Sequence, residues 1–337
     1  MRAEYERLDL ALAEPFAIAR GSRETTTNVV VRITDDAGRT GVGAAAPSTR
    51  YGETPATVEA VLPRLLDAVE AVGDPEGRQR IERRMREAVG GNPAARAAVS
   101  IALSDLAATR LGVPLHRLWG LDPSAAPPTS YTIGLAAPER MSEKAAAAVA
   151  AGHEVLKVKV GTDDDEARVA AVRAAAPDAT LRVDANEAWG PKEAVARCDV
   201  LADHGVEFVE QPVPADDPDG LRYVTEHASL PVFADEPCRD AADVVDLDGR
   251  VDGVNLKLMK CGGIREARRA IDAARAAGLE VMLGCMVETN AAIAAACHLA
   301  PLVDHADLDG SLLLAEDPYA GVDVEGGEIR LDALDRP

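Results

Sequence analysis

Residues 155–184 read VLKVKVGTDDDEARVAAVRAAAPDATLRVD, which is a short apolar strand, a helix and a second apolar strand. Within residues 164–175 the alanines and valines recur three and four positions apart, as on the buried face of an amphipathic helix. An apolar strand, a helix and another apolar strand in this order are typical of a parallel βαβ unit. This unit therefore predicts an α/β protein with parallel strands.

The same alternation continues from Thr129 through the rest of the chain. The expected strands are residues 131–135, 155–160, 181–184, 208–210, 232–235, 253–257, 281–284 and 306–308. The expected helices between them include residues 164–175, 192–204, 263–277 and 289–299. Eight strands of this kind favour a closed barrel. A doubly wound sheet would need a GxGxxG turn after an early strand, and the sequence has none.

Residues 1–125 follow a different pattern. Alternating stretches at residues 5–12 and 28–34, followed by the turn sequence DDAG at 35–38, predict an antiparallel sheet whose third strand ends at Gly43. Helical spacing then predicts helices over residues 58–72, 75–89 and 93–111. A proline-rich joint at residues 122–128 suits a linker. We therefore predict an α+β domain over residues 1–125 and the barrel over residues 126–337.

The composition excludes several classes of protein. Hydrophobic residues make up 47% and charged residues 28% of the chain, as in ordinary folded domains. The net charge of -21 would repel phosphate backbones and anionic membranes, so we expect neither nucleic acid nor a membrane as a partner. The N-terminus lacks the apolar core of a secretory signal, which predicts a cytoplasmic protein. The five cysteines are scattered without CxxC spacing, so neither a disulfide framework nor a zinc site is expected.

Lysine is rare in this chain. Only six of the 36 basic residues are lysines, and such an acidic, lysine-poor composition is favoured in a salt-rich cytoplasm, which predicts a halophilic protein. Four of the six lysines lie within residues 157–159 and 257–260, inside apolar stretches. Arginine cannot be deprotonated in a protein, whereas lysine can act as a base. These four lysines are therefore candidates for chemistry.

Three successive strands of the predicted barrel end on a carboxylate. The three are Asp184, Glu210 and Asp235, spaced 26 and 25 residues apart, which places them at the same height of the barrel. A single carboxylate at such a position more often caps the following helix. Three in register would repel one another without a cation between them, and an all-oxygen cluster suits magnesium. The spacing therefore predicts a magnesium site.

Lysines flank this trio along the chain. Lys157 and Lys159 lie two positions apart on the strand before it, so both can point into the barrel mouth. Lys257 ends the strand after it. Amines on opposite sides of a metal form a layout for moving protons at a carbon held between them.

With these residues in view, the sequence resembles the enolase superfamily in its muconate-lactonizing subgroup, and most closely the dipeptide epimerases of the L-Ala-D/L-Glu epimerase type. The resemblance covers nearly the whole chain. It is carried by the segments PFAIARG (15–21), RYGET (50–54), PLHRLWG (114–120), LKVKVG (156–161), VDANEAW (183–189), VEQPV (209–213), ADEP (234–237), NLKLMKCGGI (255–264) and GCMVET (284–289). It implies a modified TIM barrel, (β/α)7β, with an N-terminal α+β capping domain.

The resemblance also implies a mechanism. One magnesium ion per active site, held by the three carboxylates, would stabilise the enediolate that forms when the proton α to a carboxylate is removed. Lys159 and Lys257 would be the two bases. Lys157 would lie beside Lys159 and favour its neutral form by like-charge repulsion.

The end of the last strand suggests the substrate. Asp307 and Asp309 look like the Asp-x-Asp pair with which dipeptide epimerases hold the α-ammonium group, although a solvated acidic turn is the alternative. The other expected substrate contacts are Arg20, Arg23, Tyr51, Thr132, Asn186, Asn255 and Glu288. A guanidinium at Arg20 or Arg23 would pair with an acidic second residue, whereas the apolar remainder of that loop would accept a hydrophobic one.

The predicted function is therefore a magnesium-dependent epimerase that acts on the C-terminal residue of dipeptides, and we expect a homo-oligomer with a small-molecule substrate. A muconate-type cycloisomerase, an o-succinylbenzoate synthase or an N-acylamino acid racemase remain alternatives on the same scaffold. Two alternatives belong to other classes. One is an aldolase-like barrel that uses a lysine Schiff base, and the other is a non-catalytic binding barrel.

Overall fold

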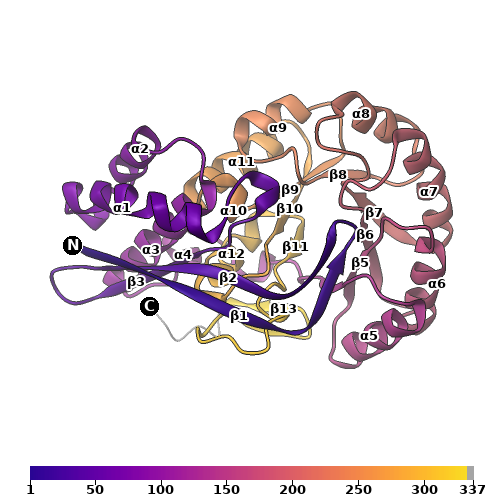
Figure 1. Ribbon diagram of the computed structural model, residues 1–337, viewed down its shortest axis with the longest axis horizontal. Coiled ribbons are helices and arrows are strands. Elements are labelled where there is room, and N and C mark those ends of the chain that lie inside the picture. The colour runs from indigo at the N-terminus through magenta and orange to yellow at the C-terminus, as the bar shows by residue number, and fades with distance from the viewer. Residues whose placement is uncertain (332–337) are drawn as a thin grey trace.

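Eight parallel strands form one sheet in the order β11-β10-β9-β8-β7-β6-β5-β4 in the computed structural model, which describes residues 1–331 (Figure 1). The strands are β4 (Tyr131–Ile133), β5 (Val155–Lys159), β6 (Thr180–Asp184), β7 (Val206–Glu210), β8 (Val232–Ala234), β9 (Gly253–Lys257), β10 (Glu280–Gly284) and β11 (His305–Asp307). The two edges meet where Thr129 forms a parallel bridge with Ala306. The Ser130 amide also donates to the Ala306 carbonyl at 3.0 Å, so the sheet closes into a barrel.

Helices lie between successive strands and cover the outside of the barrel (Figure 1). They are α5 (Pro138–Ala150), α6 (Asp165–Ala175), α7 (Pro191–Asp203), α8 (Pro218–His227), α9 (Ala241–Leu247), α11 (Ile264–Ala276) and α12 (Asn290–Cys297), with the short α10 (Leu258–Cys261) directly after β9. In α11 both isoleucines and Ala267, Ala270 and Ala274 are buried, and none of its arginines is, as its spacing predicts. The order of elements within residues 1–331 is that of a (β/α)7β barrel, which confirms the predicted fold.

Several strands end one or two residues before their predicted ends. Asp235 follows β8 instead of ending it, because its amide donates to the Gln211 side chain at 2.9 Å and leaves the ladder. The Leu308 amide likewise donates to the Thr129 hydroxyl at 2.7 Å, so β11 stops at Asp307. In both places a side chain replaces the neighbouring strand as hydrogen-bond partner, which the apolar pattern of the sequence does not reveal.

The N-terminal part contains an antiparallel sheet of β1 (Arg2–Ile18), β2 (Gly21–Thr34) and β3 (Thr40–Ala45), in that order. The helices α1 (Pro55–Val72), α2 (Arg78–Ala88), α3 (Pro93–Leu111) and α4 (Leu115–Leu118) follow it. Helix α3 packs closely on β3, since a Cβ added at Gly43 would lie 2.3 Å from the Ala98 carbonyl. The predicted helix over residues 75–89 is a 3-10 turn, η2 (Pro75–Gly77), followed by α2. The predicted division after residue 125 coincides with the end of η3 (Pro123–Ala125), and residues 332–337 of the predicted barrel range lie outside the described residues.

The β1–β2 hairpin is longer than predicted and reaches the barrel (Figure 1). Its tip lies over the C-terminal ends of the barrel strands, because the Leu135 amide donates to the Ala17 carbonyl at 2.8 Å. On its returning strand the Thr26 hydroxyl donates to the Val287 carbonyl at 3.3 Å. A second loop, with the 3-10 turn η1 (Thr49–Tyr51), approaches the same end of the barrel. The N-terminal part therefore contributes two loops to whatever site the barrel mouth contains.

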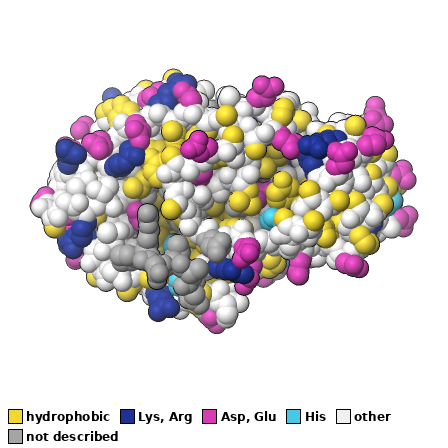
Figure 2. Space-filling view, turned by 90° about the horizontal axis from the view of Figure 1, so that it is seen from below, with side chains coloured by type: hydrophobic (Ala, Val, Ile, Leu, Met, Phe, Trp, Pro, Cys, Tyr) yellow, Lys and Arg dark blue, Asp and Glu magenta, His cyan; other side chains and the backbone are white. Residues whose placement is uncertain are grey.

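Acidic side chains are spread over the face shown in Figure 2 and do not gather in one patch. Arginines and lysines are interspersed among them on that face. Among residues 1–331, no helix combines the length and the apolar character that crossing a bilayer requires.

Candidate functional site

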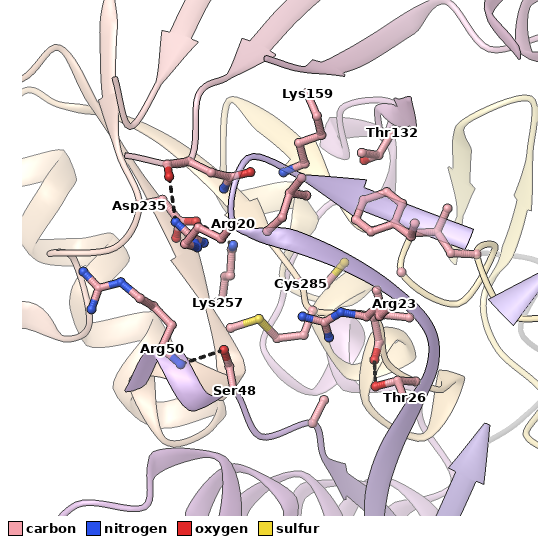
Figure 3. Close-up of a pocket in the computed structure, with 18 of the residues that line it drawn as sticks. Arg20, Arg23, Thr26, Ser48, Arg50, Thr132, Lys159, Asp235, Lys257 and Cys285 are labelled. Atoms are coloured by element: carbon pink, nitrogen blue, oxygen red, sulfur yellow. Dashed lines mark hydrogen bonds and ion pairs between the residues drawn. The ribbon is translucent and has the colours of Figure 1, made fainter. Parts of the chain in front are cut away.

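A cavity of about 420 Å³ lies in the mouth of the barrel beneath the two N-terminal loops (Figure 3). Its lining from the N-terminal part includes Phe16, Ile18, Arg20, Arg23, Thr26, Ser48, Arg50 and Tyr51. Its lining from the barrel includes Thr132, Lys157, Lys159, Asn186, Asp235, Glu236, Lys257, Cys285, Met286, Asp307 and Asp309. The cavity thus brings together most of the residues that the sequence singled out.

The ladder register places the three predicted metal ligands side by side. Asp184 on β6 is the Cα partner of Glu210 on β7, and Asp235 follows the next strand, β8. All three side chains are almost completely buried. The ladder β6–β7 pairs Asp184 directly with Glu210, 26 positions later. On β8 the Cα partner of Glu210 is Phe233, and Asp235 lies two positions beyond it, so its side chain projects to the same face as that of Phe233.

Each of these carboxylates has one oxygen held by a scaffold group. The Asn186 amide donates to Asp184 Oδ1 at 2.9 Å, and Asn255 Nδ2 donates to Glu210 Oε1 at 2.7 Å. Lys260 Nζ donates to Asp235 Oδ1 at 2.5 Å. The other oxygen of each carboxylate faces one of the pocket lysines. The trio therefore presents three fixed oxygens toward the lysines.

Among the three lysines that line the cavity, Lys157 is the most buried. Its Nζ is 2.6 Å from Glu210 Oε2, 2.7 Å from Asp307 Oδ2 and 3.3 Å from Asp184 Oδ2. Burial disfavours its charge, but these carboxylates outweigh burial and raise the pKa of Lys157 well above its usual range. Lys157 is therefore a fixed positive charge that links the predicted metal ligands to Asp307.

Lys159 and Lys257 enter the cavity from different sides (Figure 3). Lys159 ends β5 and its Nζ donates to Asp184 Oδ2 at 2.5 Å. Lys257 ends β9 and its Nζ donates to Asp235 Oδ2 at 2.7 Å. Burial opposes the charge of Lys257, but Asp235 and Glu210 raise its pKa. The two amines flank the carboxylate trio, in the order that the chain predicts.

The chemistry of the trio fits a divalent cation. Burial raises the pKa of Glu210 to about 6, and the charge of Asp184 adds to this effect. Within residues 1–331 no three carboxylate, histidine or cysteine groups lie close enough together to hold an ion. In this structure each carboxylate of the trio is within ion-pair distance of a lysine amine. Hard carboxylate oxygens at one level, each with its second oxygen already held, are nevertheless the donors that magnesium selects.

A second acidic pair lies on the other side of Lys157. Asp307 Oδ1 accepts a hydrogen bond from the Ser130 hydroxyl at 2.5 Å, and Asp309 Oδ2 accepts one from the Thr132 amide at 2.6 Å. Both side chains are buried, so the alternative of a solvated acidic turn is wrong. Burial and the neighbouring Asp307 charge raise the pKa of Asp309 to about 7. A cationic group bound here would relieve that repulsion.

Two predicted substrate contacts lie behind the cavity lining. The Asn255 amide is engaged by Glu210, and it fits there because a Cβ on the adjacent Gly284 would lie 2.5 Å from Asn255 Oδ1. Glu288 accepts a hydrogen bond from the Met286 amide at 3.2 Å, and burial raises its pKa to about 8. Both lie outside the lining of the cavity, as Asp184 and Glu210 also do, and their roles as substrate contacts stay predictions. Asn255 holds the predicted metal ligand Glu210.

The arginines of the hairpin tip differ in their surroundings. Arg20 NH1 lies 3.0 Å from Glu187 Oε2, and Arg20 NH2 lies 2.8 Å from Glu236 Oε1. Arg23 is exposed at the edge of the cavity, and among residues 1–331 no carboxylate lies within ion-pair distance of it. Of the two predicted specificity residues, Arg23 is the one whose charge is available to a substrate.

Sequence reasoning missed several residues of this site, namely Ser130, Glu187, Glu236 and the site role of Lys260. Lys260 had a signal, because it is one of four lysines gathered in the barrel of a lysine-poor chain. The Arg20–Glu187 pair joins residues 167 positions apart in two regions of the chain, and no local pattern marks it. Arg50 lines the cavity together with Tyr51, and no local pattern of the sequence marks it either.

Comparisons with known proteins agree with this geometry. Residues 140–333 match the family described as "Enolase C-terminal domain-like", and residues 5–120 match "Mandelate racemase / muconate lactonizing enzyme, N-terminal domain". The chain is 39% identical to L-Ala-D/L-Glu epimerase of Bacteroides thetaiotaomicron, over 99% of this chain and 86% of that protein.

Two solved structures are similar over the whole fold. One is a dipeptide epimerase from Enterococcus faecalis complexed with Mg and the dipeptide L-Leu-L-Tyr, with a TM-score of 0.91, 38% identity, and coverage of 97% of this chain and 95% of the other. The second is a substrate-liganded complex of the L-Ala-D/L-Glu epimerase from Bacillus subtilis, with a TM-score of 0.90, 34% identity, and coverage of 97% and 94%.

Proposed function

The chain belongs to the mandelate racemase / muconate lactonizing enzyme family of the enolase superfamily, and on this premise we propose that it is a magnesium-dependent dipeptide epimerase. The observation that carries the proposal is the arrangement of three fixed carboxylate oxygens between Lys159 and Lys257. A buried acidic pair lies in the same cavity. The three carboxylates suit a substrate carboxylate that is held through a cation, and the acidic pair suits a substrate ammonium group.

The proton transfer follows from the two lysines. One lysine, as the neutral amine, removes the proton on the α-carbon of the C-terminal residue, and the electron pair moves into the substrate carboxylate to give an enediolate. The protonated lysine on the opposite face then returns a proton, and the configuration is inverted. Magnesium, when held by Asp184, Glu210 and Asp235, supplies the positive charge that favours this transition state over the bound substrate.

The other residues position the substrate. Asp307 and Asp309 would bind the α-ammonium group, with the Thr132 amide holding Asp309 in place. Tyr51 from the N-terminal part and Asn186 from the barrel both line the cavity, and both would contact the substrate. Cycloisomerases and o-succinylbenzoate synthases bind no ammonium group, and Schiff-base chemistry needs no oriented carboxylate trio. The dipeptide reaction uses both features.

A panel of free and N-acetylated dipeptides tests this function. We expect uptake of one deuterium at the C-terminal α-carbon of free L,L-dipeptides in heavy water, and a loss of at least about a hundredfold in kcat/KM on acetylation. Acetylation deletes the charge that the two aspartates bind, which leaves buried charges unpaired. Asp309→Asn should weaken the binding of free dipeptides and lower the ratio of kcat/KM for free dipeptides to that for acetylated ones. Asp9→Asn, which changes an exposed carboxylate on β1, is the control. N-acyl substrates that react as well as free dipeptides would instead favour an N-acylamino acid racemase.

We propose that Arg23 selects the side chain of the C-terminal residue. Its guanidinium is exposed at the cavity edge without an ion pair within residues 1–331, whereas Arg20 already pairs with Glu187 and Glu236. Arg23→Gln should lower kcat/KM for L-Ala-L-Glu by about tenfold or more while changing that for an uncharged side chain by less than about twofold. The ratio of the two kcat/KM values is the measurement. An unchanged ratio would assign specificity to the apolar part of the lining.

We also infer the setting of the enzyme from its composition. A net charge of -21 with six lysines among 36 basic residues suits a salt-rich cytoplasm, because surface carboxylates keep a protein solvated under strong screening. A cytoplasmic location and a homo-oligomeric state stay predictions. Sedimentation velocity in buffers with and without high potassium chloride would test the oligomeric state and its dependence on salt.

A further inference from the structure

One carboxylate joins both N-terminal loops to the barrel. Glu187 lies in the loop between β6 and α7, and its two oxygens accept hydrogen bonds from Arg50 NH2 at 2.6 Å and Arg50 Nε at 2.7 Å. Arg20 NH1 donates to the same carboxylate at 3.0 Å, and the Ala215 amide donates at 2.8 Å. A bidentate arginine, a second arginine and a backbone amide thus converge on one side chain, which is only 11% exposed.

The backbone at Glu187 is held in an unfavourable conformation. Asn186 has φ of 46° and Glu187 has φ of 71°, in the left-handed region that costs a non-glycine residue free energy. The Glu187 amide donates to the Gln211 carbonyl at 2.9 Å, which holds this turn to the next strand. Backbone in this region persists only where the surroundings fix it, and it is found at functional sites. Here it presents the carboxylate to the loops above the barrel.

The hairpin tip and this turn also pack against the same glycine. A Cβ added at Gly161 would lie 2.7 Å from Ala188 Cβ and 2.8 Å from Ala19 Cβ, so both segments approach Gly161 without space for a side chain there. Beside this contact, Arg20 donates to the Asn186 carbonyl at 2.9 Å and pairs with Glu236. Arg20 and Arg50 lie on the same side of the cavity (Figure 3). The ion pairs and the packing therefore reinforce one another.

We propose that Glu187 is a positioning residue that clamps residues 19–23 and 48–52 over the cavity. These two segments hold Arg23 and Tyr51, which face the space for the substrate side chain. Among the described residues, the polar contacts of the Glu187 side chain go to Arg20, Arg50 and Ala215, and none goes to the lysines or carboxylates of the proposed mechanism. The clamp would fix where the substrate side chain is recognised and leave the proton transfer itself unchanged.

Limited proteolysis tests the clamp without any substrate. Glu187→Gln removes the charge but keeps the trypsin sites at Arg20, Arg23 and Arg50. Cleavage of a folded protein tracks the population of the open segment when opening is fast. We expect cleavage after these arginines to accelerate by about tenfold, measured by mass spectrometry of the first fragments, at an unchanged melting temperature. Glu187→Ala should give an equal or larger acceleration.

Glu266→Gln is the matched control. Glu266 on α11 also accepts hydrogen bonds from two arginines, Arg86 NH1 on α2 at 2.6 Å and Arg269 NH1 at 2.8 Å, so it likewise joins the N-terminal part to the barrel. It lies outside the cavity lining. Cleavage of Glu187→Gln at the wild-type rate would overturn the clamp, because opening would then not depend on Glu187. An equal acceleration in Glu266→Gln would also overturn it, because the effect would then follow the loss of any such ion pair.

Kinetics supplies a second measurement, and this part rests on the proposed function. We expect Glu187→Gln to raise KM for the preferred dipeptide about tenfold with kcat within about twofold of wild type. Arg50→Gln should change KM in the same direction, and the double variant should be no worse than Glu187→Gln alone, since that variant has already lost the ion pair with Arg50. A fall in kcat at constant KM would overturn the positioning role. If the wild type acts on no dipeptide, the proposed function fails while proteolysis still decides the clamp.

Discussion

Glu210→Gln is expected to lower kcat by at least about a thousandfold while the protein stays folded. The substitution keeps the shape of the side chain, and its Oε1 can still accept the hydrogen bond from Asn255 Nδ2. It removes one of three negative charges and places an amide where Glu210 Oε2 now lies 2.6 Å from Lys157 Nζ. The remaining two carboxylates would bind magnesium poorly, and several kcal/mol of charge stabilisation in the transition state would be lost.

Metal binding can be measured apart from activity. Calorimetric titration with magnesium chloride should show one site per chain in the wild type and a much weaker site in Glu210→Gln, and a chelator should abolish wild-type turnover until magnesium is restored. Glu207→Gln is the control, because Glu207 lies on the same strand but pairs with Arg182 outside the cavity. Full activity in chelated wild-type enzyme would exclude the metal mechanism.

The repeat of apolar strands and helices was sufficient to predict the barrel. The spacing of 26 residues between Asp184 and Glu210 is the register of the ladder β6–β7, which sets their level. Asp235 lies two positions beyond Phe233, the ladder partner of Glu210, so its spacing predicts the strand end and not the register. Strand ends were less predictable, because side chains such as Gln211 and Thr129 replace the ladder there. Apolar periodicity indicates which face of a strand is buried. It holds no information about which side chain accepts the hydrogen bond from the last backbone amide of the strand.

Contacts between residues far apart in the sequence could not be predicted for the same reason. The sequence predicts Asn255 as a substrate contact, and the structure joins its side-chain amide to Glu210 by a hydrogen bond between strands β7 and β9. Arg20, one of the two arginines that the sequence offers to an acidic substrate side chain, forms ion pairs with Glu187 and Glu236. Whether a charged side chain is free depends on partners that lie far away in the sequence, and these become visible only when the loops are placed over the barrel.

Lys159→Met and Lys257→Met are both expected to stop epimerisation, by at least about ten-thousandfold, yet to differ in the exchange that they retain. In the proposed mechanism each lysine would face the α-carbon from its own side, because the two amines reach the cavity from β5 and β9 and pair with different carboxylates, Asp184 and Asp235. A variant with one base left can still remove and return the proton on that base's side. It should therefore exchange the α-hydrogen of one epimer with deuterated solvent without inverting it.

The two variants should show opposite stereochemistry, which proton magnetic resonance of L,L- and L,D-dipeptides in heavy water would reveal. Lys192→Met, at an exposed lysine on α7 outside the cavity, should retain wild-type epimerisation and controls for the substitution itself. If both variants exchange the same epimer, one lysine serves both faces and the two-base layout is wrong. If neither variant exchanges either epimer while magnesium still binds, each lysine is required to hold the carboxylate beside it. The ion pairs of Lys159 with Asp184 and of Lys257 with Asp235 would then also be needed when the substrate is bound.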